Sequence, residues 1–125
     1  MIDHVSIGVS DLVRSAAFYE AVLGAIGMSR LVTRPASVGF GKRYPEIWLN
    51  HRPGMIAIPE TAGAHVCLRA RSEDAVRAFH ASALLHGGTD DGAPGPRKAE
   101  LTPYFAAFVR DPDGNRLEAA TFPAA

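Results

Sequence analysis

The sequence His4-Val5-Ser6-Ile7 falls on the sequence His65-Val66-Cys67-Leu68 when the chain is shifted by 61 residues without a gap. The same shift aligns further apolar and glycine positions: Ala17-Phe18 with Ala78-Phe79, Leu23 with Leu84, and Gly27 with Gly88. Each copy reads as a strand that begins at a histidine, followed by a helix and a glycine stop. Because self-similarity at a fixed spacing indicates a repeated structural unit, we interpret the chain as two copies of one unit.

The first unit has a strand, a helix and three further strands. Val5, Ile7 and Val9 alternate with polar or small residues, which predicts a strand at about 3–9. Ser10 or Asp11 can cap the helix that follows. Its apolar stripe has helical spacing and comprises Leu12, Ala16, Tyr19, Leu23 and Ile26. Three short strands are expected at about 28–34, 37–41 and 46–50, separated by prolines.

The second unit repeats this plan. We expect a strand at about 64–70 and a helix capped by Ser72, with its core face made by Val76, Phe79, Ala83 and Leu84. Residues 86–103 are rich in glycine and proline and predict a loop with at most one short strand. A hairpin at about 104–110 and 115–122 turns at Asp111-Pro112-Asp113-Gly114. The sequence therefore predicts an α+β fold of two tandem βαβββ modules, about 1–60 and 61–125, in a single domain.

Composition excludes several classes of protein. The chain has 125 residues, and thirteen Lys and Arg balance thirteen Asp and Glu, so no basic surface for nucleic acid is expected. No apolar run is long enough to cross a membrane, and the first residues do not resemble a signal peptide. The single cysteine, Cys67, cannot form a disulfide within the chain. We therefore expect a cytoplasmic protein.

The two equivalent histidines are candidates for a metal site. In both first strands the apolar residues must face the helices, so His4 and His65 point to the opposite face together with Cys67 and Arg69. Glu118 occupies the last predicted strand, and it completes a set of two imidazoles and one carboxylate if it faces the same cavity. Such a set suits Fe, Mn, Co, Ni or Zn with positions left open for a substrate.

Two further stretches carry a resemblance to a known family. They are the run from His4 to Leu12, which leads into Ala17-Phe18-Tyr19, and the run from Phe108 through Asp111-Pro112-Asp113-Gly114-Asn115 to Glu118. With the His65 strand, the chain resembles the vicinal oxygen chelate superfamily, also called the glyoxalase/bleomycin-resistance/dioxygenase group. The resemblance implies paired modules that form a cupped mixed sheet around a divalent metal. It also implies that His4, His65 and Glu118 are ligands, with Glu118 as the catalytic base where the reaction is a proton transfer.

The fourth ligand position of this family falls in the predicted strand 46–50, where Glu46 and Trp48 share a face. A carboxylate from Glu46 would resemble the isomerases of the lactoylglutathione lyase (glyoxalase I) type. Trp48 in that position would leave three ligands, as in extradiol dioxygenases and fosfomycin-modifying transferases of the superfamily. We favour Trp48 as a pocket wall because it lies nearer the middle of the strand.

The resemblance implies a metal-dependent enzyme that acts on a small substrate with adjacent oxygens, either lyase and isomerase or dioxygenase chemistry. The alternative is a metal-free binding protein of the bleomycin-resistance type, which sequesters a small molecule. We expect Arg69, Cys67 and Tyr104 to line the substrate pocket. We expect Arg97 to be a solvated loop charge. The family also implies a homodimer.

Overall fold

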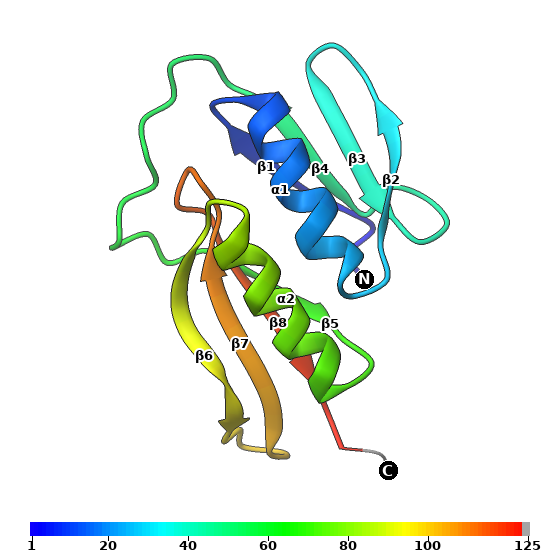
Figure 1. The fold of residues 1–125 in the computed structure, drawn as a ribbon, viewed down its shortest axis with the longest axis vertical. Helices are drawn as coiled ribbons and strands as arrows, with labels where there is room; N and C mark the ends of the chain where they lie inside the picture. Colours follow the sequence, from blue (N-terminus) through cyan, green and yellow to red (C-terminus); the bar gives the residue numbers. More distant parts are fainter. Residues whose placement is uncertain (124–125) are drawn as a thin grey trace.

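Two βαβββ modules follow one another along the chain in the computed structural model, which describes residues 1–123 (Figure 1). The first module contains β1 (Val5–Val9), α1 (Leu12–Gly24), β2 (Ser29–Thr33), β3 (Ser37–Gly41) and β4 (Ile47–His51). The second contains β5 (His65–Arg69), α2 (Glu73–Leu85), β6 (Thr89–Arg97), β7 (Tyr104–Arg110) and β8 (Arg116–Thr121). The predicted tandem of two equivalent modules is confirmed.

Each module forms its own four-stranded mixed sheet. The strand orders are β1-β4-β3-β2 and β5-β8-β7-β6, so corresponding strands occupy corresponding places. β1 pairs in parallel with β4, and β5 with β8, whereas the other neighbours are antiparallel. The predicted mixed arrangement of parallel and antiparallel strands is thus present. Within one chain, these strands are divided between two separate sheets. β1 and β5 are edge strands, and their backbone groups on one side are not used in either ladder.

The helices cover one face of the sheets and pack against each other (Figure 1). Asp11 caps α1 by accepting from the amide of Arg14, and Ser72 caps α2 by accepting from that of Ala75. The predicted stripe of α1 is largely buried, with Tyr19 and Leu23 fully so. The prediction that Leu84 belongs to the core face of α2 is wrong, because Leu84 lies on the solvent side of the helix and is 47% exposed. Neither helix combines the length and apolarity needed to cross a membrane.

β6 is longer than the sequence suggests. The stretch expected to be mainly loop forms a nine-residue strand, Thr89–Arg97, although it contains two glycines and two prolines. β6 is an edge strand, so a proline without an amide hydrogen can be accommodated there. Its ladder with β7 shifts register around Gly92, and such irregularities absorb the residues that cannot pair. The loop predicted from the glycine and proline content of this segment is therefore wrong over Thr89–Arg97.

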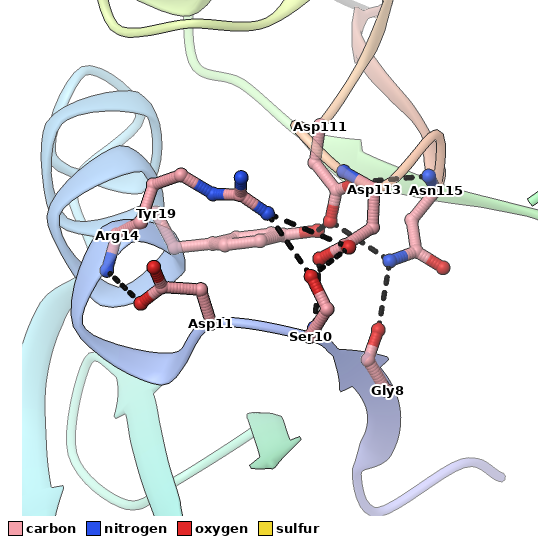
Figure 2. Close-up of polar contacts among 8 residues, drawn as sticks. All are labelled: Gly8, Ser10, Asp11, Arg14, Tyr19, Asp111, Asp113 and Asn115. Atoms are coloured by element: carbon pink, nitrogen blue, oxygen red, sulfur yellow. Dashed lines mark hydrogen bonds and ion pairs between the residues drawn. The ribbon is translucent and has the colours of Figure 1, made fainter. Parts of the chain in front are cut away.

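The turn between β7 and β8 joins the two modules (Figure 2). The carboxylate of Asp113 accepts from the amide of Ser10 at 3.0 Å and also from its hydroxyl. Asn115 donates through Nδ2 to the carbonyl of Gly8 at 3.0 Å, and Tyr19 donates to Asp111. The sequence predicts a turn in this segment from its proline and glycine, but it does not predict these contacts with the first module. Its remaining polar side chains serve the contact with β1 and α1.

Candidate functional site

The face of the second sheet that points away from α2 carries the candidate site. In the strand register Cys67 lies opposite Glu118, and Glu118 lies opposite Phe108, so one row of side chains crosses β5, β8 and β7. His65 and Tyr104 belong to the same face because side chains alternate along each strand. The apolar residues between them, such as Leu68 and Leu117, are buried in the core. We call this surface the site face.

The imidazole of His65 and the carboxylate of Glu118 are in direct contact. Nε2 of His65 lies 3.0 Å from Oε1 of Glu118. The side chain of Glu118 is 6% exposed, whereas that of His65 is 46% exposed. A buried carboxylate requires a partner, because transfer of a lone charge from water is costly. An imidazole nitrogen, which is a common metal ligand, therefore lies beside a carboxylate that is largely shielded from water.

Two other groups on the site face interact with the same carboxylate. Burial raises the pKa of the Cys67 thiol to about 12, and the nearby negative charge of Glu118 adds to this effect. The pKa of Tyr104 is also raised, first by burial and then by Glu118. At neutral pH both groups keep their protons. Cys67 is consequently a thiol beside the carboxylate rather than a nucleophilic thiolate.

His4 lies just before β1 and is exposed, with Nδ1 2.8 Å from Oδ1 of Asp3. It lines a cavity of about 340 Å³ together with Glu46, His65 and Cys67. Both equivalent histidines thus border one cavity, at the beginnings of β1 and β5. Within residues 1–123, no three or more His, Cys, Asp or Glu side chains come together in an arrangement that could hold a metal. The structure brings His65 and Glu118 into contact, whereas the ring of His4 contacts Asp3.

The register distinguishes the two residues considered for a fourth ligand. Ser6 pairs with Trp48 in the first module, and its equivalent Cys67 pairs with Glu118 in the second. Trp48 therefore stands where the second module has Glu118. Its ring packs over Gly39, where an added Cβ would lie 3.0 Å from the indole. Glu46 lies one alternation earlier and lines the cavity with His4.

The remaining candidates lie farther along the site face. The ring of Tyr104 stacks on that of Phe122, with centroids 5.3 Å apart. The guanidinium of Arg69 lies over the ring of Phe122, 4.5 Å from its centroid. Arg97 ends β6 opposite Tyr104 and reaches over Phe108 at 5.5 Å. The expected loop position of Arg97 is wrong, because Arg97 is the last residue of β6.

Comparison with known proteins identifies the family. The family model described as the Glyoxalase/Bleomycin resistance protein/Dioxygenase superfamily matches residues 1–119. The chain belongs to this superfamily. The resemblance noted in the sequence is thereby confirmed over nearly the whole chain, and the superfamily's fold is the one described above. A comparison with curated proteins gives no match.

Solved structures of other superfamily proteins have the same fold. A glyoxalase/bleomycin resistance protein from Albidiferax ferrireducens is 29% identical, with a TM-score of 0.84 over 95% of this chain and 97% of that chain. A glyoxalase/bleomycin resistance protein/dioxygenase family enzyme from Burkholderia phytofirmans is 18% identical, with a TM-score of 0.71 and 98% of each chain covered. A glyoxalase I mutant from Zea mays is 24% identical, with a TM-score of 0.73. The match covers 94% of the present chain and 44% of the maize chain.

Proposed function

We propose that this chain is a metal-dependent enzyme that acts on a small substrate with adjacent oxygens, with His4, His65 and Glu118 as metal ligands. The contact between His65 and the buried Glu118 is the observation that supports this proposal most directly. Imidazole nitrogen and carboxylate oxygen are suitable donors for Fe, Mn, Co, Ni or Zn. The donor chemistry of the pair therefore fits such an ion.

A bound divalent ion would act as a Lewis acid toward the oxygens of the substrate. In this proposal Glu118 accepts and returns the substrate proton where the reaction is a lyase or isomerase step. His65 orients that carboxylate, and the neighbouring Cys67 and Tyr104 stay protonated beside it at neutral pH. With Trp48 rather than a carboxylate at the corresponding position, three protein ligands would leave positions open, which also suits dioxygenase chemistry.

We further propose that the site is completed by a second copy of the chain. His65 and Glu118 come from the second sheet, whereas His4 belongs to the first, and no ladder joins the two sheets within residues 1–123. The edge strands β1 and β5 are available to a partner molecule. In this arrangement His4 of one subunit would join His65 and Glu118 of the other. A monomer in light scattering at micromolar concentration would contradict it.

Metal analysis of protein purified without a chelating tag tests the metal proposal. We expect about one transition-metal ion per site. His65→Ala should weaken metal binding at least about tenfold, because a ligand and the partner of Glu118 are lost together. His86→Ala is the matched control, since His86 caps the far end of α2 and bonds to the carbonyl of Ser82. Failure of the wild-type chain to bind any added transition metal would refute the proposal.

A metal-free binding protein is the second candidate. It is favoured by His4, whose ring contacts Asp3 instead of joining a three-donor group within residues 1–123. On this hypothesis a small molecule would occupy the cup without reaction. Calorimetry separates the two hypotheses by comparing the affinity of the wild type and of His65→Ala for the same small molecule. If the chain is only a binding protein, loss of the His65 ring should leave that affinity unchanged. A large loss of affinity in His65→Ala would favour the enzyme.

A further inference from the structure

The imidazole of His65 leans along the site face to reach its partner. In the strand register His65 lies opposite Arg116, whereas Glu118 belongs to the next row on the same face. The ring nevertheless brings Nε2 to 3.0 Å from Oε1 of Glu118. The side chain of His65 is 46% exposed and stands on an edge strand. Because the second side-chain torsion of histidine is broad, one hydrogen bond at Nε2 does not by itself fix the plane of the ring.

Phe108 makes a second contact with this ring. The centroids of the two rings lie 6.2 Å apart, with 50° between their planes, which is an ordinary geometry for packed rings. Phe108 stands on β7 directly opposite Glu118 on β8. The two groups that touch the imidazole are therefore cross-strand neighbours, and they contact different parts of it. The carboxylate binds Nε2, and the phenyl ring packs against the imidazole.

The ring of Phe108 is itself held by β6. Gly92 pairs with Phe108 in the register, and a Cβ added at Gly92 would lie 2.9 Å from Cδ1 and 3.2 Å from Cβ of Phe108. The guanidinium of Arg97 lies over the same ring, 5.5 Å from its centroid. Arg97 in turn donates to the carbonyls of Ala93 and Pro96. β6 therefore restrains the ring of Phe108 through both backbone and side-chain contacts.

We propose that Phe108 is a positioning residue for the metal site and holds the imidazole of His65 in the orientation that places Nε2 beside Glu118. This inference rests on the proposed function, in which His65 and Glu118 are ligands. Groups outside the ligand set commonly orient ligating histidines, and their loss lowers metal affinity. Through Phe108, β6 contributes to the site although it carries no proposed ligand.

The mobility of the His65 ring, measured by NMR relaxation, tests the inference in the metal-free chain. The full chain is labelled with ¹³C at the histidine rings and kept in EDTA, and the order parameter of each Cδ2–H bond is measured. For His65 we expect a value near that of ordered backbone, about 0.85, in the wild type and a value below about 0.6 in Phe108→Leu. Phe108→Tyr keeps the ring and should keep the wild-type value. Phe122→Leu is the matched control, because the ring of Phe122 stacks on that of Tyr104 instead.

A second histidine separates positioning from a general loosening of the module. His80 lies on α2 with 12% of its side chain exposed, and its Nε2 lies 2.8 Å from Oδ1 of Asp90. Its order parameter should not change in Phe108→Leu, whereas a loss of packing throughout the second module would loosen both rings. Gly92→Ala is the second variant. It keeps the ring of Phe108 but must displace it, so it should also lower the order parameter of His65.

Zinc titration by calorimetry connects the mobility of His65 to the metal site. Phe108→Leu and Gly92→Ala should each weaken binding of Zn about tenfold, because the imidazole is no longer held in place. Phe108→Tyr and Phe122→Leu should bind Zn as the wild type does. A structural defect that is unrelated to His65 would not be corrected by the tyrosine variant.

Three outcomes would overturn the inference. One is a mobile His65 ring in the wild type, or an order parameter that stays unchanged in both Phe108→Leu and Gly92→Ala. Another is an equal loss of order at His65 and His80 in Phe108→Leu. The third is wild-type affinity for Zn in a variant whose His65 ring is mobile. A wild-type chain that binds no transition metal would instead refute the proposed function, and the order parameters in EDTA would still decide whether Phe108 holds His65.

Discussion

The hydroxyl of Tyr19, on α1, donates a 2.7 Å hydrogen bond to Oδ2 of Asp111, in the turn between β7 and β8. Both residues are buried, with 0% and 3% of their surface exposed. Asp111 also accepts from Nδ2 of Asn115 and from the amide of Asp113. Burial raises the pKa of Asp111, although these hydrogen bonds oppose the effect. The contact links the two modules through a buried carboxylate, which these hydrogen-bond donors stabilise in its charged form.

Removal of the donor in Tyr19→Phe should destabilise the fold. The phenyl ring keeps the packing of the tyrosine, and the carboxylate of Asp111 loses one hydrogen bond inside the core. We expect the free energy of unfolding to fall by about 1.5–3 kcal/mol, the usual range for a bond to a charged group. Urea unfolding measures this change. Tyr44→Phe is the control because Tyr44 is 53% exposed, and an equal loss in both variants would contradict the assignment.

Alkaline pH should weaken the same contact. Burial and the adjacent Asp111 hold the pKa of Tyr19 well above its usual value of 10.0. In the unfolded chain the phenol ionises near that value, so stability from Tyr19 is complete below pH 10 and declines as pH rises further. We expect the wild type to lose up to about 1.4 kcal/mol more per pH unit than Tyr19→Phe in this range. Parallel stability profiles of the two proteins above pH 10 would contradict this.

Gly114 in the same turn should resist substitution. Its φ of +94° lies in a region that L side chains rarely adopt, and an added Cβ would lie 3.0 Å from the carbonyl oxygen of Ile58. Gly114→Ala should therefore lower the free energy of unfolding by about 1–2 kcal/mol. Gly24→Ala is the matched control, because nothing lies within 4 Å of its Cβ position at the end of α1. Thermal or urea unfolding should show Gly24→Ala to be neutral or stabilising.

Sequence periodicity predicted most of this fold because each module repeats the same local signals. The alternation in β1 and β5 and the caps at Asp11 and Ser72 are local properties, and they appear where expected. β6 was not predicted, since its glycines and prolines are tolerated through edge position and register shifts. Those features depend on the partner strand β7 and leave no pattern within residues 89–97.

The candidate site was predictable only within each module. Alternation predicted the face of His65 but left the face of Glu118 open, and the register between β5 and β8 places both residues on one face. The offset between Glu46 and Trp48 required the register with β1, which no local pattern determines. The position of His4 relative to the His65–Glu118 pair depends on how two separate sheets are arranged. Sequence could not supply that relationship.

Mixing of two defective variants can decide whether His4 acts across a dimer. His4→Ala lacks one proposed ligand, and Glu118→Gln keeps the shape of the buried side chain but loses its charge. Each variant alone should bind little metal. The two are unfolded together, refolded and titrated with metal under the conditions used for the wild type. If His4 of one subunit joins His65 and Glu118 of the other, each mixed dimer contains one intact site and one site that lacks both groups.

Random association makes half of the dimers mixed, so the mixture should recover about a quarter of the wild-type metal capacity. A ligand set contained within one chain would give no recovery, because every chain carries one defect. A mixture of His4→Ala with His65→Ala should also recover, since His65 and Glu118 would come from the same subunit. A mixture of His65→Ala with Glu118→Gln is the control. It should show no recovery, because these two residues contact each other within one sheet.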